Sequence, residues 1–252
     1  MLEARIRESC KQKTSAKPRV EHCRVQTERN SDFDTRFVSA ALVLGGIMTA
    51  AGYFLRPVDI GQIFTIENFR EISNSMTIWI RSFQILVFGL FVRLAALAAL
   101  SMLHTKSAQN APVFAGTAIC VSALLVTTLC EGYYMHMGAW GTGEIQNAGD
   151  AANNAFLSSI RPLSEWVICL ARMGNMFFCF GFIILGFGFQ ITKIVGKWPG
   201  IAAMLIGAAG MMILMLLPND AAAYLPISLA ITLWFVALGA TLTFGIHQTS
   251  QS

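Results

Sequence analysis

The segment Trp166–Ile191 reads WVICLARMGNMFFCFGFIILGFGFQI and contains a single charged residue, Arg172. A helix crosses the hydrocarbon core of a bilayer, about 30 Å thick, with about 20 mostly apolar residues at about 1.5 Å of rise each. This segment exceeds that length, and its apolar side chains are continuous rather than confined to one helical face. It therefore predicts a transmembrane helix.

Five further segments have the same length and apolar character. They are Phe37–Leu55, Ile78–Leu103, Val113–Met135, Gly200–Leu217 and Leu225–Ile246. Charged residues make up 13% of the chain, against about 25% in soluble proteins, so much of the surface does not face water. The predicted fold class is all-α: a polytopic transmembrane helical bundle with six spanning helices.

The distribution of lysine and arginine predicts the orientation, because these residues are enriched in cytoplasmic segments. With the N-terminus inside, the outer segments hold only Arg56, Arg70 and Arg161, whereas the tail and both inner loops are richer in basic residues. Both termini are therefore expected in the cytoplasm. An uncleaved N-terminus and the absence of N-x-S/T sequons from the outer segments favour the inner membrane of a bacterium.

The chain divides into three parts on this prediction. Residues 1–36 form a cytoplasmic basic tail of mixed charge and few apolar residues, expected to be disordered or marginally helical. Residues 37–247 form the six-helix transmembrane domain, and residues 248–252 form a short cytoplasmic tail.

Two outer segments have enough length to hold structure of their own. Ile66, Phe69 and Ile72 recur at helical spacing between the first two spans. Gly138–Glu165 is rich in glycine, asparagine and alanine, and its part Asn154–Arg161 is compatible with a short interfacial helix. Both segments are interpreted either as lids packed over the bundle or as ordinary connectors.

Three charged residues near the outer helix ends predict a cluster. An arginine at the centre of a spanning helix costs about 2.5–3.5 kcal/mol on insertion scales, so it normally has a partner. Arg81, Glu131 and Arg172 lie at matching depth, so Glu131 is predicted to pair with Arg81 or Arg172, with Gln84 one turn from Arg81 on the same side. The alternative is that these charges reach the headgroups or only hold helices together. As a site, the cluster would form an outer pocket for an anionic group.

Arg93 lies near the middle of the membrane, with no acidic residue at the same depth in the other spans. Its guanidinium group is expected to reach backbone carbonyls, water, a lipid phosphate or a partner subunit. The alternative is that the helix is tilted and Arg93 extends to the inner interface.

No cofactor is predicted from the sequence. Met135, His136 and Met137 are soft copper ligands, but consecutive side chains on a helix point about 100° apart, so they would converge only where the helix unwinds. No catalytic or phosphate-binding motif occurs.

The preferred functional interpretation is a non-enzymatic accessory, assembly or regulatory subunit that acts through helix–helix interactions. It rests on the sparse polarity of the spans. The expected partners are membrane lipids and another membrane protein or a second copy of the chain, not nucleic acid. One alternative is a small transporter or receptor for an anionic or amphipathic solute. Another is a lipid-acting enzyme at the outer face around Glu131 and His136.

Overall fold

The computed structural model describes residues 17–58, 64–103, 111–145, 149–192, 195, 197–217 and 221–249. The helices are α2 (Lys17–Phe54), α3 (Ile66–Asn74), α4 (Met76–Leu103), α5 (Ala111–Ile145), α6 (Asp150–Thr192), α7 (Lys197–Leu216) and α8 (Ala221–Thr249). Every helix except α3 contains a segment long and apolar enough to cross a membrane, six in all. No strand occurs in the described ranges. The predicted class, an all-α bundle with six helices able to span, is confirmed.

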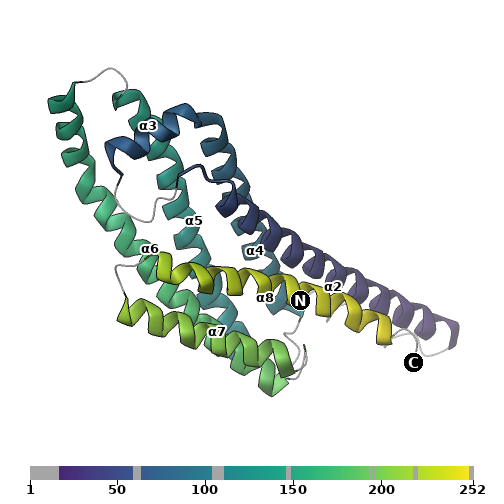
Figure 1. Cartoon of the computed structure of the whole chain (residues 1–252). Coiled ribbons are helices and arrows are strands. Elements are labelled where there is room, and N and C mark those ends of the chain that lie inside the picture. Colours follow the sequence, from purple (N-terminus) through teal and green to yellow (C-terminus); the bar gives the residue numbers. More distant parts are fainter. Residues whose placement is uncertain are drawn as a thin grey trace.

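The six long helices form a closed ring. Each packs against the next along the chain, from α2 through α4, α5, α6 and α7 to α8, and α8 returns to pack against α2. Figure 1 shows α8, in yellow, lying beside the purple α2. Because α8 packs against α2, side chains from both ends of the sequence surround the same interior of the bundle.

Glycines bring neighbouring helices of the ring into backbone contact. A Cβ atom added at Gly52 would lie 2.6 Å from Cβ of Leu86, where α2 meets α4. One added at Gly116 would overlap the Leu185 backbone, where α5 meets α6. Because hydrocarbon does not drive apolar helices together, close packing at small residues is a main source of their association.

The predicted outer segment Gly138–Glu165 is mostly helical, which corrects its assignment as a loop. α5 continues to Ile145 and α6 begins at Asp150, so the two helices have 35 and 43 residues. Residues predicted as a separate interfacial helix, Asn154–Arg161, are part of α6. Both helices exceed the roughly 20 residues that a span requires.

The helix α3 packs against the end of α5 that continues beyond the predicted span. Thr65 caps its N-terminus by accepting a hydrogen bond from the backbone amide of Asn68 at 3.2 Å. The helical spacing of Ile66, Phe69 and Ile72 agrees with α3, in which Phe69 and Ile72 are buried and the Phe69 ring packs directly on Gly141 of α5. The α6 end takes part in the same contact, because the ring of Phe156 lies 6.0 Å from that of Phe69, centroid to centroid.

The predicted tails overlap the helices. α2 begins at Lys17, so the backbone of residues 17–36 is helical, within the segment assigned to a disordered or marginally helical tail. Residues 1–16 lie outside the described ranges. At the other end α8 continues to Thr249, two residues past the predicted boundary at 247. The assignment of these segments to the cytoplasm stays a prediction.

Candidate functional site

Glu131 forms an ion pair with Arg56, a residue that the sequence assigned to an outer loop. Nη2 of Arg56 lies 2.5 Å from Oε2 of Glu131, and both side chains are about 11% exposed. The hydroxyl of Tyr53 donates to Oε1 of Glu131 at 3.2 Å. The Arg56 guanidinium group also lies over the rings of Tyr53 and Phe83, 4.7 and 4.2 Å from their centroids. Both oxygens of the carboxylate are thus occupied.

The predicted pairing of Glu131 with Arg81 or Arg172 is therefore wrong. Arg81 and Gln84 are exposed on the outside of α4, and Arg172 is half-buried on α6. The prediction from the sequence looked for a partner of Glu131 only among charged residues inside the spans. Arg56 follows the end of α2, and its long side chain folds back into the bundle along aromatic rings. Its position in a predicted loop did not indicate this contact.

Arg93 lies inside the bundle rather than at the inner interface, which excludes the interpretation that it reaches the headgroups. Its side chain is 3% exposed. The stem crosses α2 at Gly45, where an added Cβ atom would lie 2.7 Å from Cγ of Arg93. Its guanidinium carbon lies 4.1 Å from the centroid of the Phe235 ring. Nε has no hydrogen-bond partner among the described residues.

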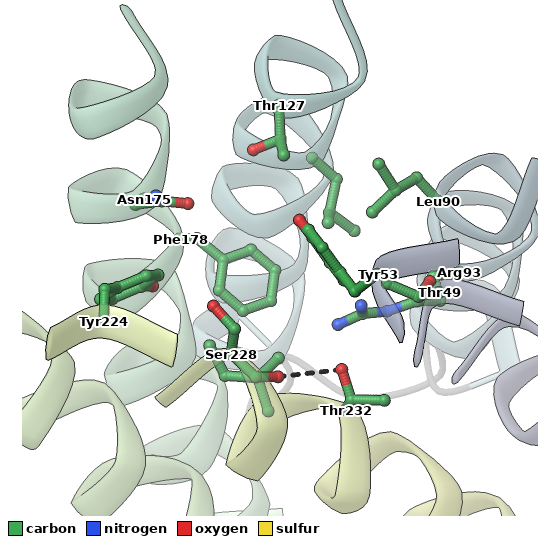
Figure 2. Close-up of a pocket in the computed structure, with 12 residues that line it drawn as sticks. Thr49, Tyr53, Leu90, Arg93, Thr127, Asn175, Phe178, Tyr224, Ser228 and Thr232 are labelled. Atoms are coloured by element: carbon green, nitrogen blue, oxygen red, sulfur yellow. Dashed lines mark hydrogen bonds between the residues drawn. The ribbon is translucent and has the colours of Figure 1, made fainter. Parts of the chain in front are cut away.

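The Arg93 side chain lines a pocket in the interior of the ring, with a cavity volume of about 50 Å³. Its walls come from five of the six long helices and combine one charge, several hydroxyls, one amide and apolar side chains. The lining residues are Thr49, Tyr53, Leu90, Arg93, Leu124, Thr127, Asn175, Phe178, Tyr224, Ser228, Ile231 and Thr232. Figure 2 shows the Arg93 guanidinium group directed toward the middle of this space. No lining residue carries a carboxylate.

Several hydroxyl groups around the pocket already donate their hydrogens elsewhere. Thr49, Thr127 and Thr232 donate to carbonyls one turn back on their own helices, at 2.7, 3.1 and 2.9 Å. Tyr53 donates to Glu131. These oxygens can accept hydrogen bonds, but their protons are not directed into the cavity.

Three lining groups keep donors for a bound molecule. No hydrogen bond joins the Arg93 guanidinium group, the Asn175 amide or the Ser228 hydroxyl to another described residue. Nε of Arg93 is itself buried, so the Nη groups are the donors of Arg93 that a ligand could reach. Arg93, Asn175 and Ser228 lie on α4, α6 and α8 and face the cavity from different sides (Figure 2). Sequence reasoning selected Arg93 but missed Asn175 and Ser228. An asparagine in the middle of an apolar span was the available signal, because polar groups in hydrocarbon normally have a partner.

The copper hypothesis for Met135, His136 and Met137 required an unwound helix. α5 is continuous through these residues, and their exposure differs: Met137 is buried, Met135 half-buried and His136 exposed. The three side chains therefore point in different directions. In the described part of the chain, no three His, Cys, Asp or Glu residues are grouped to hold a metal ion.

Comparison of the chain with protein-family models, with curated proteins and with solved structures finds no match.

Proposed function

We propose that this protein binds an anionic or amphipathic solute in the Arg93 pocket, as a small membrane transporter or receptor. The observation that carries the proposal is Arg93, which is 3% exposed and lies beside a cavity that has polar and apolar walls and no carboxylate among its lining residues. Glu131 does not balance this charge, because Arg56 already neutralises it.

Among the described residues, Arg93 is an unbalanced charge in the interior of the bundle. Placing a charged group at low dielectric without a counter-ion is unfavourable by several kcal/mol. Stacking on Phe235 offsets a part of that cost, since a desolvated cation–π contact contributes about 2 kcal/mol. An anion in the cavity would offset more. A buried arginine without an acidic partner beside a cavity is therefore typical of a ligand site.

The other two interpretations have less support. The accessory-subunit interpretation rested on sparse interior polarity and gives no role to the buried Arg93, which lines a cavity together with the buried Thr49 and Thr232. The lipid-acting enzyme required Glu131 and His136 to act together. Glu131 is bound by Arg56 and Tyr53, and His136 is exposed.

The Arg93 pocket also differs from the cluster of Arg81, Glu131 and Arg172. That cluster was the anion site predicted from the sequence for a transporter or receptor. None of these three side chains lines the pocket. Both termini in the cytoplasm and a bacterial inner membrane remain parts of the proposal, supported by the distribution of basic residues.

The test uses the full chain in nanodiscs of phosphatidylcholine, which has no net charge. Thermal unfolding is measured with sodium salts of chloride, acetate, propionate, decanoate and sulfate at constant ionic strength. At least one anion should raise the unfolding temperature in a saturable manner, because a ligand of the folded state stabilises it by mass action. Arg93→Gln should remove that rise, whereas Arg70→Gln, which removes an exposed charge on α3, should retain it.

A saturable effect that persists in Arg93→Gln, or the lack of any effect with all five salts, would overturn the proposal. Uptake of the binding anion into proteoliposomes then separates a transporter from a receptor.

A further inference from the structure

We infer that the pocket selects a small monocarboxylate, an inference that rests on the proposed function and specifies its ligand. Three features carry it: the single net charge of the pocket walls, the directions of the three donors, and the size and lining of the cavity.

The charge of the pocket selects a monoanion. Arg93 contributes the one formal charge among the lining residues. The nearest acidic group along α5, Glu131, lies one turn beyond Thr127 and is neutralised by Arg56. A monoanion would make the interior neutral. A dianion such as sulfate would leave one uncompensated negative charge at low dielectric, which is unfavourable by several kcal/mol.

The donors favour a planar oxyanion with two oxygens over a spherical halide. The Arg93 guanidinium carbon lies over the Phe235 ring, 4.1 Å from its centroid. No described residue accepts a hydrogen bond from this group, so its accessible N–H donors remain for a ligand. A guanidinium edge matches a carboxylate with two parallel hydrogen bonds. The Asn175 amide and the Ser228 hydroxyl also line the cavity, and each can donate a hydrogen bond to a carboxylate oxygen.

The cavity limits what can be attached to the carboxylate. A single water requires about 10–15 Å³ of cavity volume on this measure, so about 50 Å³ accommodates only a few non-hydrogen atoms. Leu90, Leu124, Phe178 and Ile231 supply apolar walls beside the polar groups. A short alkyl chain would contact these walls, whereas a second charged group would be left without a partner.

The experiment measures dissociation constants in the same nanodiscs by isothermal titration calorimetry, with propionate, chloride and sulfate as probes. Propionate should bind most tightly. Asn175→Ala and Ser228→Ala should each weaken propionate binding about five- to tenfold, the equivalent of about 1 kcal/mol for one hydrogen bond. Asn154→Ala on α6 and Ser122→Ala on α5, both exposed, are the matched controls and should retain the dissociation constant.

The outcomes separate this inference from the proposed function. If chloride or sulfate binds more tightly than propionate and the binding depends on Arg93, the inference of a monocarboxylate ligand is wrong. The proposed anion site at Arg93 is then still supported. If propionate binds but neither Asn175→Ala nor Ser228→Ala weakens it, the donor assignment is wrong. If no anion binds with dependence on Arg93, both proposals fail. Because Asn175→Ala and Ser228→Ala leave Arg93 in place, they test the donor assignment even if Arg93→Gln does not fold.

Discussion

Tyr53 donates a hydrogen bond from its hydroxyl to Oε1 of Glu131, with the two oxygens 3.2 Å apart. Its ring lines the pocket, and the Glu131 carboxylate pairs with Arg56 one turn farther toward the end of the bundle where α3 lies. The Tyr53 side chain thus contacts both the pocket and the ion pair between Arg56 and Glu131. This arrangement links the stability of the outer helix ends to the geometry of the pocket.

Glu131→Gln should destabilise the protein more than removal of both partners of the ion pair. The substitution leaves the Arg56 guanidinium group about 11% exposed without a counter-ion, and breaking one side of a buried pair costs about 3–5 kcal/mol. The double variant Arg56→Gln/Glu131→Gln should recover part of that loss. Thermal unfolding of the purified chain in detergent measures all three proteins. A double variant less stable than Glu131→Gln would contradict a direct pairing.

Tyr53→Phe should lower the free energy of unfolding by about 1.5–3 kcal/mol, the contribution of a hydrogen bond to a charged group. The phenylalanine ring would still lie against Arg56. Combined with Glu131→Gln in a double-mutant cycle, the two effects should not add, because both remove the same contact. Additive effects within about 0.5 kcal/mol would show that the hydroxyl acts elsewhere.

Gly116→Ala should destabilise the contact between α5 and α6, because the added methyl group would overlap the Leu185 backbone. Overpacking of this kind costs about 1–3 kcal/mol. Gly132, on the same helix, has no atom within 4 Å of an added Cβ, so Gly132→Ala should stay within about 0.5 kcal/mol of the parent. Unfolding temperatures of the two variants provide the comparison. Equal effects would show that α5 and α6 are farther apart than in the structure.

Reporter fusions test the orientation. Green fluorescent protein fused after Ser252 should fluoresce in a bacterial host, since it folds in the cytoplasm, and alkaline phosphatase inserted between Ile145 and Asp150 should be active, since it requires the periplasm. The excess of lysine and arginine in the tail and inner loops is the physical reason. The opposite pair of results would invert the bundle and place α3 on the cytoplasmic side.

The spans, their number and the α3 helix were predictable from the sequence. Their signals are local: about 20 consecutive apolar residues for a span, and the spacing of Ile66, Phe69 and Ile72 for α3. The outer ends of α5 and α6 were not predictable in this way. Their glycine- and asparagine-rich composition is typical of loops, and only the packing of Phe69 on Gly141 shows why the helix continues.

The sequence by itself determined which segments are long and apolar enough to cross a membrane and placed Arg93 near the middle of one of them, because hydrophobic length and charge are properties of segments. Only the tertiary structure decided which groups meet. It paired Glu131 with Arg56 instead of Arg81 or Arg172, and it brought Asn175 and Ser228 to the same cavity as Arg93. The physical reason is that partners depend on helix rotation and ring closure, which arise from contacts between distant segments and leave no local pattern.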